Sequence, residues 1–97
     1  MEILEFDYPA HTKANGRGCV GVVGSGDLEV LLEPANTDCS RVRVRTSVQG
    51  FATTWKAVLD RFFSHHDEAV YIEINDAGAT PGTVTLRLEQ ALEASRR

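Results

Sequence analysis

One serine in this sequence has the surroundings of a reactive or modified side chain. Ser25 stands between Gly24 and Gly26 and is followed by Asp27. A serine hydroxyl becomes a nucleophile only when a neighbouring base activates it, and no histidine or acid is obviously placed to do so. Ser25 is therefore interpreted as a site that another enzyme modifies, or as part of an ordinary Gly-Ser-Gly turn. Asp27 is expected either to close that turn with a hydrogen bond or to contact the modifying enzyme.

The apolar residues on either side predict that the serine lies at the tip of a β-hairpin. Opposite residues of an antiparallel pair share one face of the sheet. A three-residue loop pairs Val22 with Leu28 and Val20 with Val30, whereas the two-residue alternatives place valines opposite acids. Gly26 supplies the left-handed conformation that ends such a loop. The serine hydroxyl is thus expected to project into solvent.

Two other groups of polar residues have less specific patterns. A basic stripe on one strand face is expected to pair with Glu29 or Glu33, or to serve as a docking surface or contact phosphates; it comprises Arg41, Arg43 and Arg45. His65 and His66 are adjacent and would point in different directions along a helix, and no third ligand is suitably spaced. No metal site is predicted.

Hydrophobic periodicity predicts the elements that position the hairpin. Alternation of apolar and polar residues predicts five strands, at about 2–8, 17–23, 27–33, 41–47 and 70–75. Helical spacing predicts one helix capped by Thr53 or Thr54 and a second that begins at Thr80-Pro81. The apolar stripe of the first helix is Trp55, Val58, Leu59, Phe62 and Phe63, and that of the second is Val84, Leu88, Ala91 and Leu92.

The order β-β-β-β-α-β-α predicts an α/β (α+β) two-layer sandwich. The strand–helix–strand unit over 41–75 implies one parallel pair in an otherwise mostly antiparallel, mixed sheet of about five strands. Each helix has a single apolar face, so both are expected to cover the same side of the sheet.

Length and charge limit the classes of function. The 97 residues are expected to form one domain, 1–97. No apolar run approaches the roughly 20 residues of a membrane helix, and the first residues lack a signal peptide's features, so a cytoplasmic protein is expected. Ten basic against 14 acidic residues give a formal charge of −4, which argues against a nucleic-acid partner.

Three segments in order resemble a known family. Val22–Leu31, Asn75–Gly82 and Leu86–Gln90 are similar to the acyl carrier (delta) subunit of bacterial malonate decarboxylase, and the resemblance runs nearly end to end. A more distant resemblance links the Ser-Gly-Asp tripeptide to the gamma carrier subunit of citrate lyase. Sequence reasoning offers no physical role for Asn75–Gly82 beyond a turn and a helix start.

The resemblance implies a carrier without catalytic residues. In that family the serine matching Ser25 is joined by a phosphodiester to 2′-(5″-phosphoribosyl)-3′-dephospho-CoA, whose thiol carries acetyl and malonyl thioesters. The implied partners are an acetyl/malonyl transferase subunit, carboxy-lyase subunits, a malonyl transferase and a phosphoribosyl-dephospho-CoA transferase. Gly24, Gly26 and Asp27 would support the attachment loop.

Two other classes of function remain open at this point. One is a small, non-catalytic interaction module whose hairpin docks on a partner enzyme. The other is a hydrolase that uses Ser25, which would require an activating histidine; His11 is the only histidine in the N-terminal half.

Overall fold

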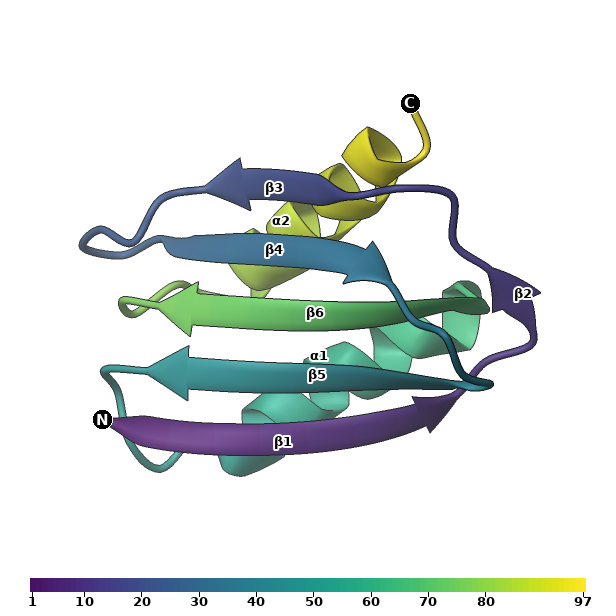
Figure 1. Cartoon of the computed structure of the whole chain (residues 1–97). Coiled ribbons are helices and arrows are strands. Elements are labelled where there is room, and N and C mark those ends of the chain that lie inside the picture. The colour runs from purple at the N-terminus through teal and green to yellow at the C-terminus, as the bar shows by residue number, and fades with distance from the viewer.

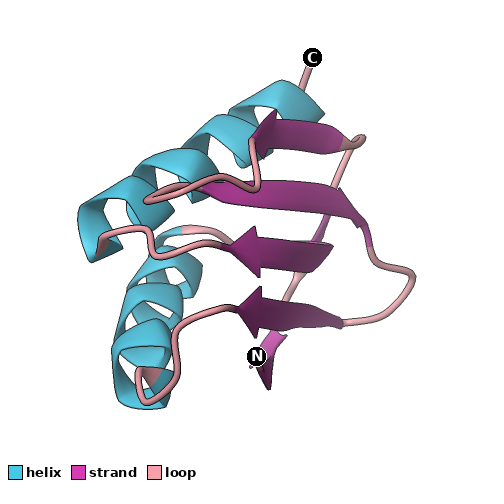
Figure 2. Ribbon diagram, turned by 90° about the vertical axis from the view of Figure 1, so that its left-hand side faces the viewer, coloured by secondary structure: helices cyan, strands magenta, loops and turns pink.

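A computed structural model describes residues 1–97 as one mixed sheet with both helices on the same face (Figures 1 and 2). The elements are β1 (Glu2–Pro9), β2 (Thr12–Lys13), β3 (Gly18–Gly21), β4 (Leu28–Pro34), β5 (Cys39–Thr46), α1 (Ala52–His65), β6 (Glu68–Asp76) and α2 (Pro81–Ser95). The strand order is β1-β5-β6-β4-β3, and β2 pairs with the beginning of β6. β5 and β6 are parallel, whereas β1–β5, β4–β6 and β3–β4 are antiparallel. The predicted two-layer fold, its element order and its parallel pair are confirmed.

The sheet has one strand more than predicted. Thr12 and Lys13 form a parallel pairing with Glu68 and Ala69, in a segment for which no strand is predicted. Both residues of β2 are exposed. A two-residue exposed strand has no alternating apolar pattern, so hydrophobic periodicity does not reveal it.

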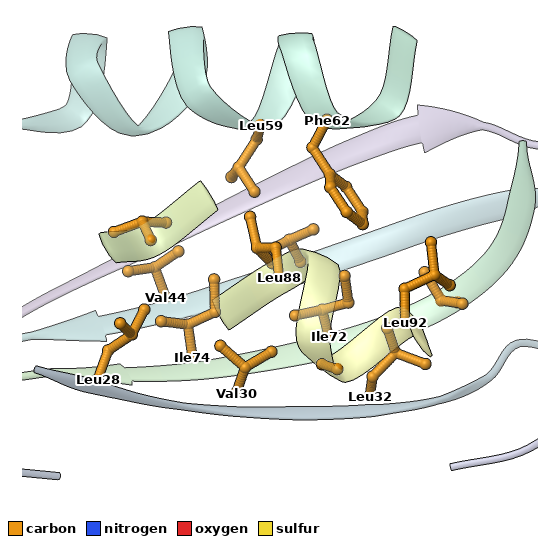
Figure 3. Packing of buried hydrophobic residues seen from close by; sticks show 14 of the residues in the cluster. Leu28, Val30, Leu32, Val44, Leu59, Phe62, Ile72, Ile74, Leu88 and Leu92 are labelled. Atoms are coloured by element: carbon orange, nitrogen blue, oxygen red, sulfur yellow. The ribbon is translucent and has the colours of Figure 1, made fainter. Parts of the chain in front are cut away.

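The core lies between the sheet and the two helices (Figure 3). Alternate residues of the central strands point into it, among them Val44 and Ile74, which are fully buried. Of the predicted stripes, Trp55, Leu59 and Phe62 of α1 are buried, as are Val84, Leu88, Ala91 and Leu92 of α2. Val58 and Phe63 of α1 are only partly buried and pack against the core. Neither helix is long and apolar enough to span a membrane.

The two helices begin differently. Thr80 caps α2 as predicted, since its Oγ1 accepts a hydrogen bond from the Thr83 N–H at 3.2 Å and Pro81 occupies the first turn. The prediction of Thr53 or Thr54 as the cap of α1 is wrong. α1 already begins at Ala52 after Phe51, whose side chain cannot cap and whose carbonyl accepts the first helical hydrogen bond.

The face of the sheet opposite the helices is open and charged. The arginines at alternate positions of β5 are exposed there, as predicted, but their expected pairing with Glu29 or Glu33 is wrong. β6 lies between β5 and β4 and keeps these groups apart. Arg41 instead donates from Nε to Asp7 Oδ1 at 2.9 Å across the β1–β5 pair, and Glu33 lies 3.5 Å from Arg17.

Candidate functional site

The candidate site is the loop between β3 and β4, at the end of the sheet where β5 and β6 also finish (left in Figure 1; Figure 2 views this end). The predicted register is confirmed where β3 and β4 form a hydrogen-bonded ladder, since Val20 faces Val30. The ladder stops at Gly21, one pair earlier than expected. Val22 does not share a buried face with Leu28: its exposed fraction is 63%, while Leu28 is fully buried.

The early end of the ladder follows from the backbone of Gly21. Its φ of 81° lies in the left-handed region, and an added Cβ there would clash with the carbonyl oxygen of Leu28. The chain therefore turns away from β4, and Leu28 pairs with Asp76 of β6 on its other side. The predicted strand over 17–23 is accordingly shorter, and Val22 and Val23 belong to the loop.

Ser25 occupies the tip of this loop and is exposed. The Asp27 N–H donates to the Gly24 carbonyl at 2.9 Å, which closes a four-residue turn with Ser25 and Gly26 at its centre. The φ of 76° at Gly26 is the value that a type II turn requires at its third residue. Apart from its two chain neighbours, no residue lies within 4 Å of a Cβ built on Gly26, so the space beside the serine is open.

The base of the loop is held by the segment that joins β6 to α2. Gly26 donates its N–H to the Ala77 carbonyl at 2.8 Å, and Ala77 donates its N–H to the Asp27 carbonyl at 2.9 Å. Asn75, two residues before Ala77, donates from Nδ2 to Glu29 Oε1 at 3.0 Å. The Asn75–Gly82 segment thus has a physical role that the sequence did not disclose: it positions the serine turn.

That segment is in turn organised by a buried acid. Asp76, with an exposed fraction of 6%, accepts hydrogen bonds on its carboxylate from Thr46 Oγ1 at 2.8 Å and from the N–H groups of Gly78 and Ala79 at 3.1 and 3.0 Å. These three donors satisfy a carboxylate that would otherwise be costly to bury. The loop after β6 is therefore fixed at its first residues.

Asp27 connects the loop to helix α2. Its carboxylate accepts from the Leu28 N–H at 2.7 Å and from Arg87 Nε and Nη2 at 3.2 and 2.9 Å. The hydrogen bonds from the Arg87 side chain and the Leu28 N–H hold the pKa of Asp27 below its ordinary value. The backbone of Asp27, not its side chain, closes the turn. Arg87 was not singled out from the sequence, because helical spacing places it beside Leu88 without indicating which loop it reaches.

No histidine lies near the serine. His11 bonds to Asp67, His66 bonds to Glu89, and His65 bonds to the Arg61 carbonyl. All three histidines are near the beginning of β6, about 25 Å along that strand from the end that supports the serine turn. Asp27 stays ionised in its pairing with Arg87 and is a poor proton acceptor. No three His, Cys, Asp or Glu side chains gather as metal ligands.

An exposed, unactivated serine on a firmly held turn is suited to being modified by another protein. A model of the malonate decarboxylase delta subunit family (MdcD) matches residues 15–95. The chain belongs to this family. Relatives in this family are named malonate decarboxylase acyl carrier protein, and the chain is accordingly an acyl carrier subunit of malonate decarboxylase.

Individual relatives are similar over almost their whole length. The chain is 50% identical to the malonate decarboxylase acyl carrier protein of Pseudomonas fluorescens strain Pf-5, over 96% of this chain and 95% of that one. Identity is 51% to the protein of the same name from Azotobacter vinelandii and 52% to that from Pseudomonas aeruginosa PAO1, with the same coverage.

A solved structure shares the fold. A chain in the crystal structure of a Pseudomonas malonate decarboxylase hetero-tetramer in complex with malonate superposes with a TM-score of 0.91 at 50% identity. The alignment covers 96% of this chain and 97% of that chain. The resemblance expected from the three sequence segments is confirmed at the level of the family.

Proposed function

We propose that this carrier subunit holds 2′-(5″-phosphoribosyl)-3′-dephospho-CoA on Ser25 through a phosphodiester and carries out no bond chemistry of its own. The observation that supports the proposal is the geometry of the turn: an exposed hydroxyl between two glycines, with open space beside it. A built Cβ at Gly24 meets only Val22 Cγ2 at 3.7 Å. A bulky substituent on Ser25 Oγ therefore fits without displacing protein atoms.

The residues around Ser25 position the hydroxyl and do not activate it. Gly26 and Asp27 hold the turn through their hydrogen bonds with Ala77, and Arg87 holds the Asp27 carboxylate. The attaching transferase must therefore supply the base that removes the serine proton. When bound, the arm supplies a thiol whose thioester stabilises the carbanion that develops as carbon dioxide leaves a malonyl group.

The partners that fit this role are the other components of a malonate decarboxylase. We expect an acetyl/malonyl transferase subunit and carboxy-lyase subunits to act on the acyl group, a malonyl transferase to charge the carrier, and a phosphoribosyl-dephospho-CoA transferase to attach the arm. An arm tethered at one point raises the effective concentration of the acyl group at each active site. The hetero-tetramer that contains the similar Pseudomonas chain supports this assignment.

Intact mass spectrometry tests the attachment. The chain is incubated with the attaching transferase and the activated prosthetic group, and Ser25→Ala and Ser25→Thr are treated in parallel. The unaltered chain should gain the mass of one arm, on a peptide containing Ser25, and Ser25→Ala should gain none. Ser25→Thr keeps a hydroxyl but adds a methyl group beside Gly26, so it should be modified more slowly. An arm on Ser25→Ala would contradict the assignment.

The same spectrum separates the carrier from a plain interaction module. A module that only docks its hairpin on a partner would be isolated from its native host without a covalent adduct. The hydrolase interpretation is disfavoured by the placement of the histidines, none of which is near Ser25. Malonate decarboxylation by the isolated loaded chain, with no other subunit, would contradict the non-catalytic role.

A further inference from the structure

An apolar pocket opens beside the serine turn, between the beginnings of α1 and α2. Its volume is about 340 Å³, which lies in the range of small-molecule sites. Its apolar lining includes Val48, Phe51, Trp55, Val58, Ala79 and Val84. Trp55 and Val84 are buried, whereas Val48 and Phe51 are exposed by 36% and 50%. The two exposed side chains leave apolar surface available at the edge of the core, above Trp55 and Val84.

The pocket is connected directly to the turn that carries Ser25. Gly26 donates to the Ala77 carbonyl at 2.8 Å, and the next two residues of the chain, Gly78 and Ala79, line the pocket. Covalent geometry and this hydrogen bond limit the path from Ser25 Cα to Gly78 N to about 8 Å. A flexible arm anchored on Ser25 can fold back across this distance.

The charge of the pocket lining favours an uncharged acyl group at the end of the arm over an anionic one. The lining contains no lysine, arginine or histidine, and its one charged side chain is the acid Asp76. The carboxylate of Asp76 already accepts hydrogen bonds from Thr46, Gly78 and Ala79. An uncharged acetyl group can enter an apolar pocket at no electrostatic cost. A malonyl carboxylate would lose its hydration there without gaining a cation, and it would approach a second anion.

We infer that this pocket binds the acyl end of the arm and holds the acetyl form in preference to the malonyl form. The inference rests on the proposed attachment at Ser25. It gives the carrier a property beyond tethering: the acetyl thioester is shielded on the carrier itself, while the malonyl thioester remains in solvent, where partner enzymes reach it.

Cleavage of the loaded thioesters by hydroxylamine measures the shielding. Acetyl-carrier and malonyl-carrier are each compared with the corresponding CoA thioester, after mass spectrometry has shown that the arm is present. A pocket occupied about nine-tenths of the time slows cleavage about tenfold, because only the free fraction reacts. The acetyl-carrier should show this protection, and the malonyl-carrier should react at the rate of malonyl-CoA.

Two threonines of α1 provide a matched pair of variants. Thr53 and Thr54 are both exposed, but only Thr54 lines the pocket. Thr54→Phe should fill the mouth and abolish the protection, and Thr53→Phe should retain it. Thr54→Lys should extend protection to the malonyl-carrier by supplying a cation, and Thr53→Lys should not.

The outcomes separate this inference from the attachment itself. If the arm is on Ser25 but the acetyl-carrier reacts as fast as acetyl-CoA, the pocket inference is wrong and the attachment stands. Equal protection of both acyl forms, or protection that survives in Thr54→Phe, also overturns the inference. If no arm is found on Ser25, the proposed function fails first and the inference with it.

Discussion

The apex and the base of the serine loop differ in how much of the molecule they contact. At the apex, Ser25 is exposed and the neighbouring Gly26 has no protein atom near a built Cβ. At the base, Gly21 packs against Leu28, and Asp27 is bonded to Ala77 and Arg87. The fold thus concentrates its restraints immediately below the exposed hydroxyl of Ser25. The comparison shows that accessibility and rigidity, which usually oppose each other in loops, are divided here between adjacent residues.

Alanine substitutions at Gly21 and Gly26 should differ most in their effect on the free energy of unfolding. Both have φ near +80°, so an alanine at either position pays for a left-handed conformation. At Gly21 the added Cβ also meets the Leu28 carbonyl oxygen, so Gly21→Ala should lower the free energy of unfolding by about 3 kcal/mol or more. Urea denaturation followed by circular dichroism measures this loss.

Gly26→Ala is the matched control, because it has the same backbone conformation without the clash. It should cost only about 1 kcal/mol. Gly26→Val should cost somewhat more and should also slow attachment of the arm, because a β-branched residue resists the left-handed φ of 76° and relaxation of the turn would shift the serine. Equal losses at Gly21 and Gly26 would show that the base of the loop is no more constrained than its apex.

The pairing of Asp27 with Arg87 predicts a pH-dependent loss in the free energy of unfolding that is smaller than the loss in Gly21→Ala. Because the pKa of Asp27 is lower in the folded chain than its ordinary value of 3.8, its contribution is complete above that value. The contribution disappears as the pH falls through the lower pKa of the folded state. Asp27→Asn should therefore unfold more easily than the unaltered chain at pH 7, and the gap should narrow as the pH falls below 3.8.

Arg87→Gln tests whether this pH dependence belongs to the ion pair. It should remove the same stability at pH 7 as Asp27→Asn, and the double variant should lose little more than either single one. Additive losses would mean that the two side chains stabilise the loop independently.

Ser25→Ala should have the smallest effect on stability. Removing an exposed hydroxyl at a turn apex should change the free energy of unfolding by no more than about 0.5 kcal/mol. The loss of attachment should nevertheless be complete, because the hydroxyl is the proposed anchor of the arm. Thermal melting, measured on the same samples as the mass, tests this. A melting temperature of Ser25→Ala as low as that of Gly21→Ala would contradict the difference between the apex and the base of the loop.

The features that the sequence could predict are those set by residues close together in the chain. Alternation in β5 and helical spacing in α2 predicted which side chains enter the core, because burial follows directly from the period of the element. Thr80-Pro81 predicted the start of α2 because cap and first turn are adjacent in sequence. The Val20–Val30 register followed from the requirement that apolar residues share a face.

Contacts between segments far apart in the chain were beyond sequence reasoning. The Asp27–Arg87 pair joins residues 60 positions apart, and nothing in the helical pattern indicates which partner Arg87 finds. The bond between Gly26 and Ala77 uses backbone atoms, which every residue has, and so leaves no trace in residue types. The arginines of β5 were assigned the wrong partners because the sheet order, with β6 between β5 and β4, is a global property.

The two backbone hydrogen bonds between the serine turn and Ala77 also have a kinetic consequence. A free loop loses conformational entropy each time it is captured, and that loss weakens binding and slows recognition. Here the folding of the chain has already fixed the backbone on both sides of Ser25. An enzyme that acts on Ser25 as proposed would meet the same backbone shape each time. The conformational entropy lost on binding would then come only from the group attached to the serine.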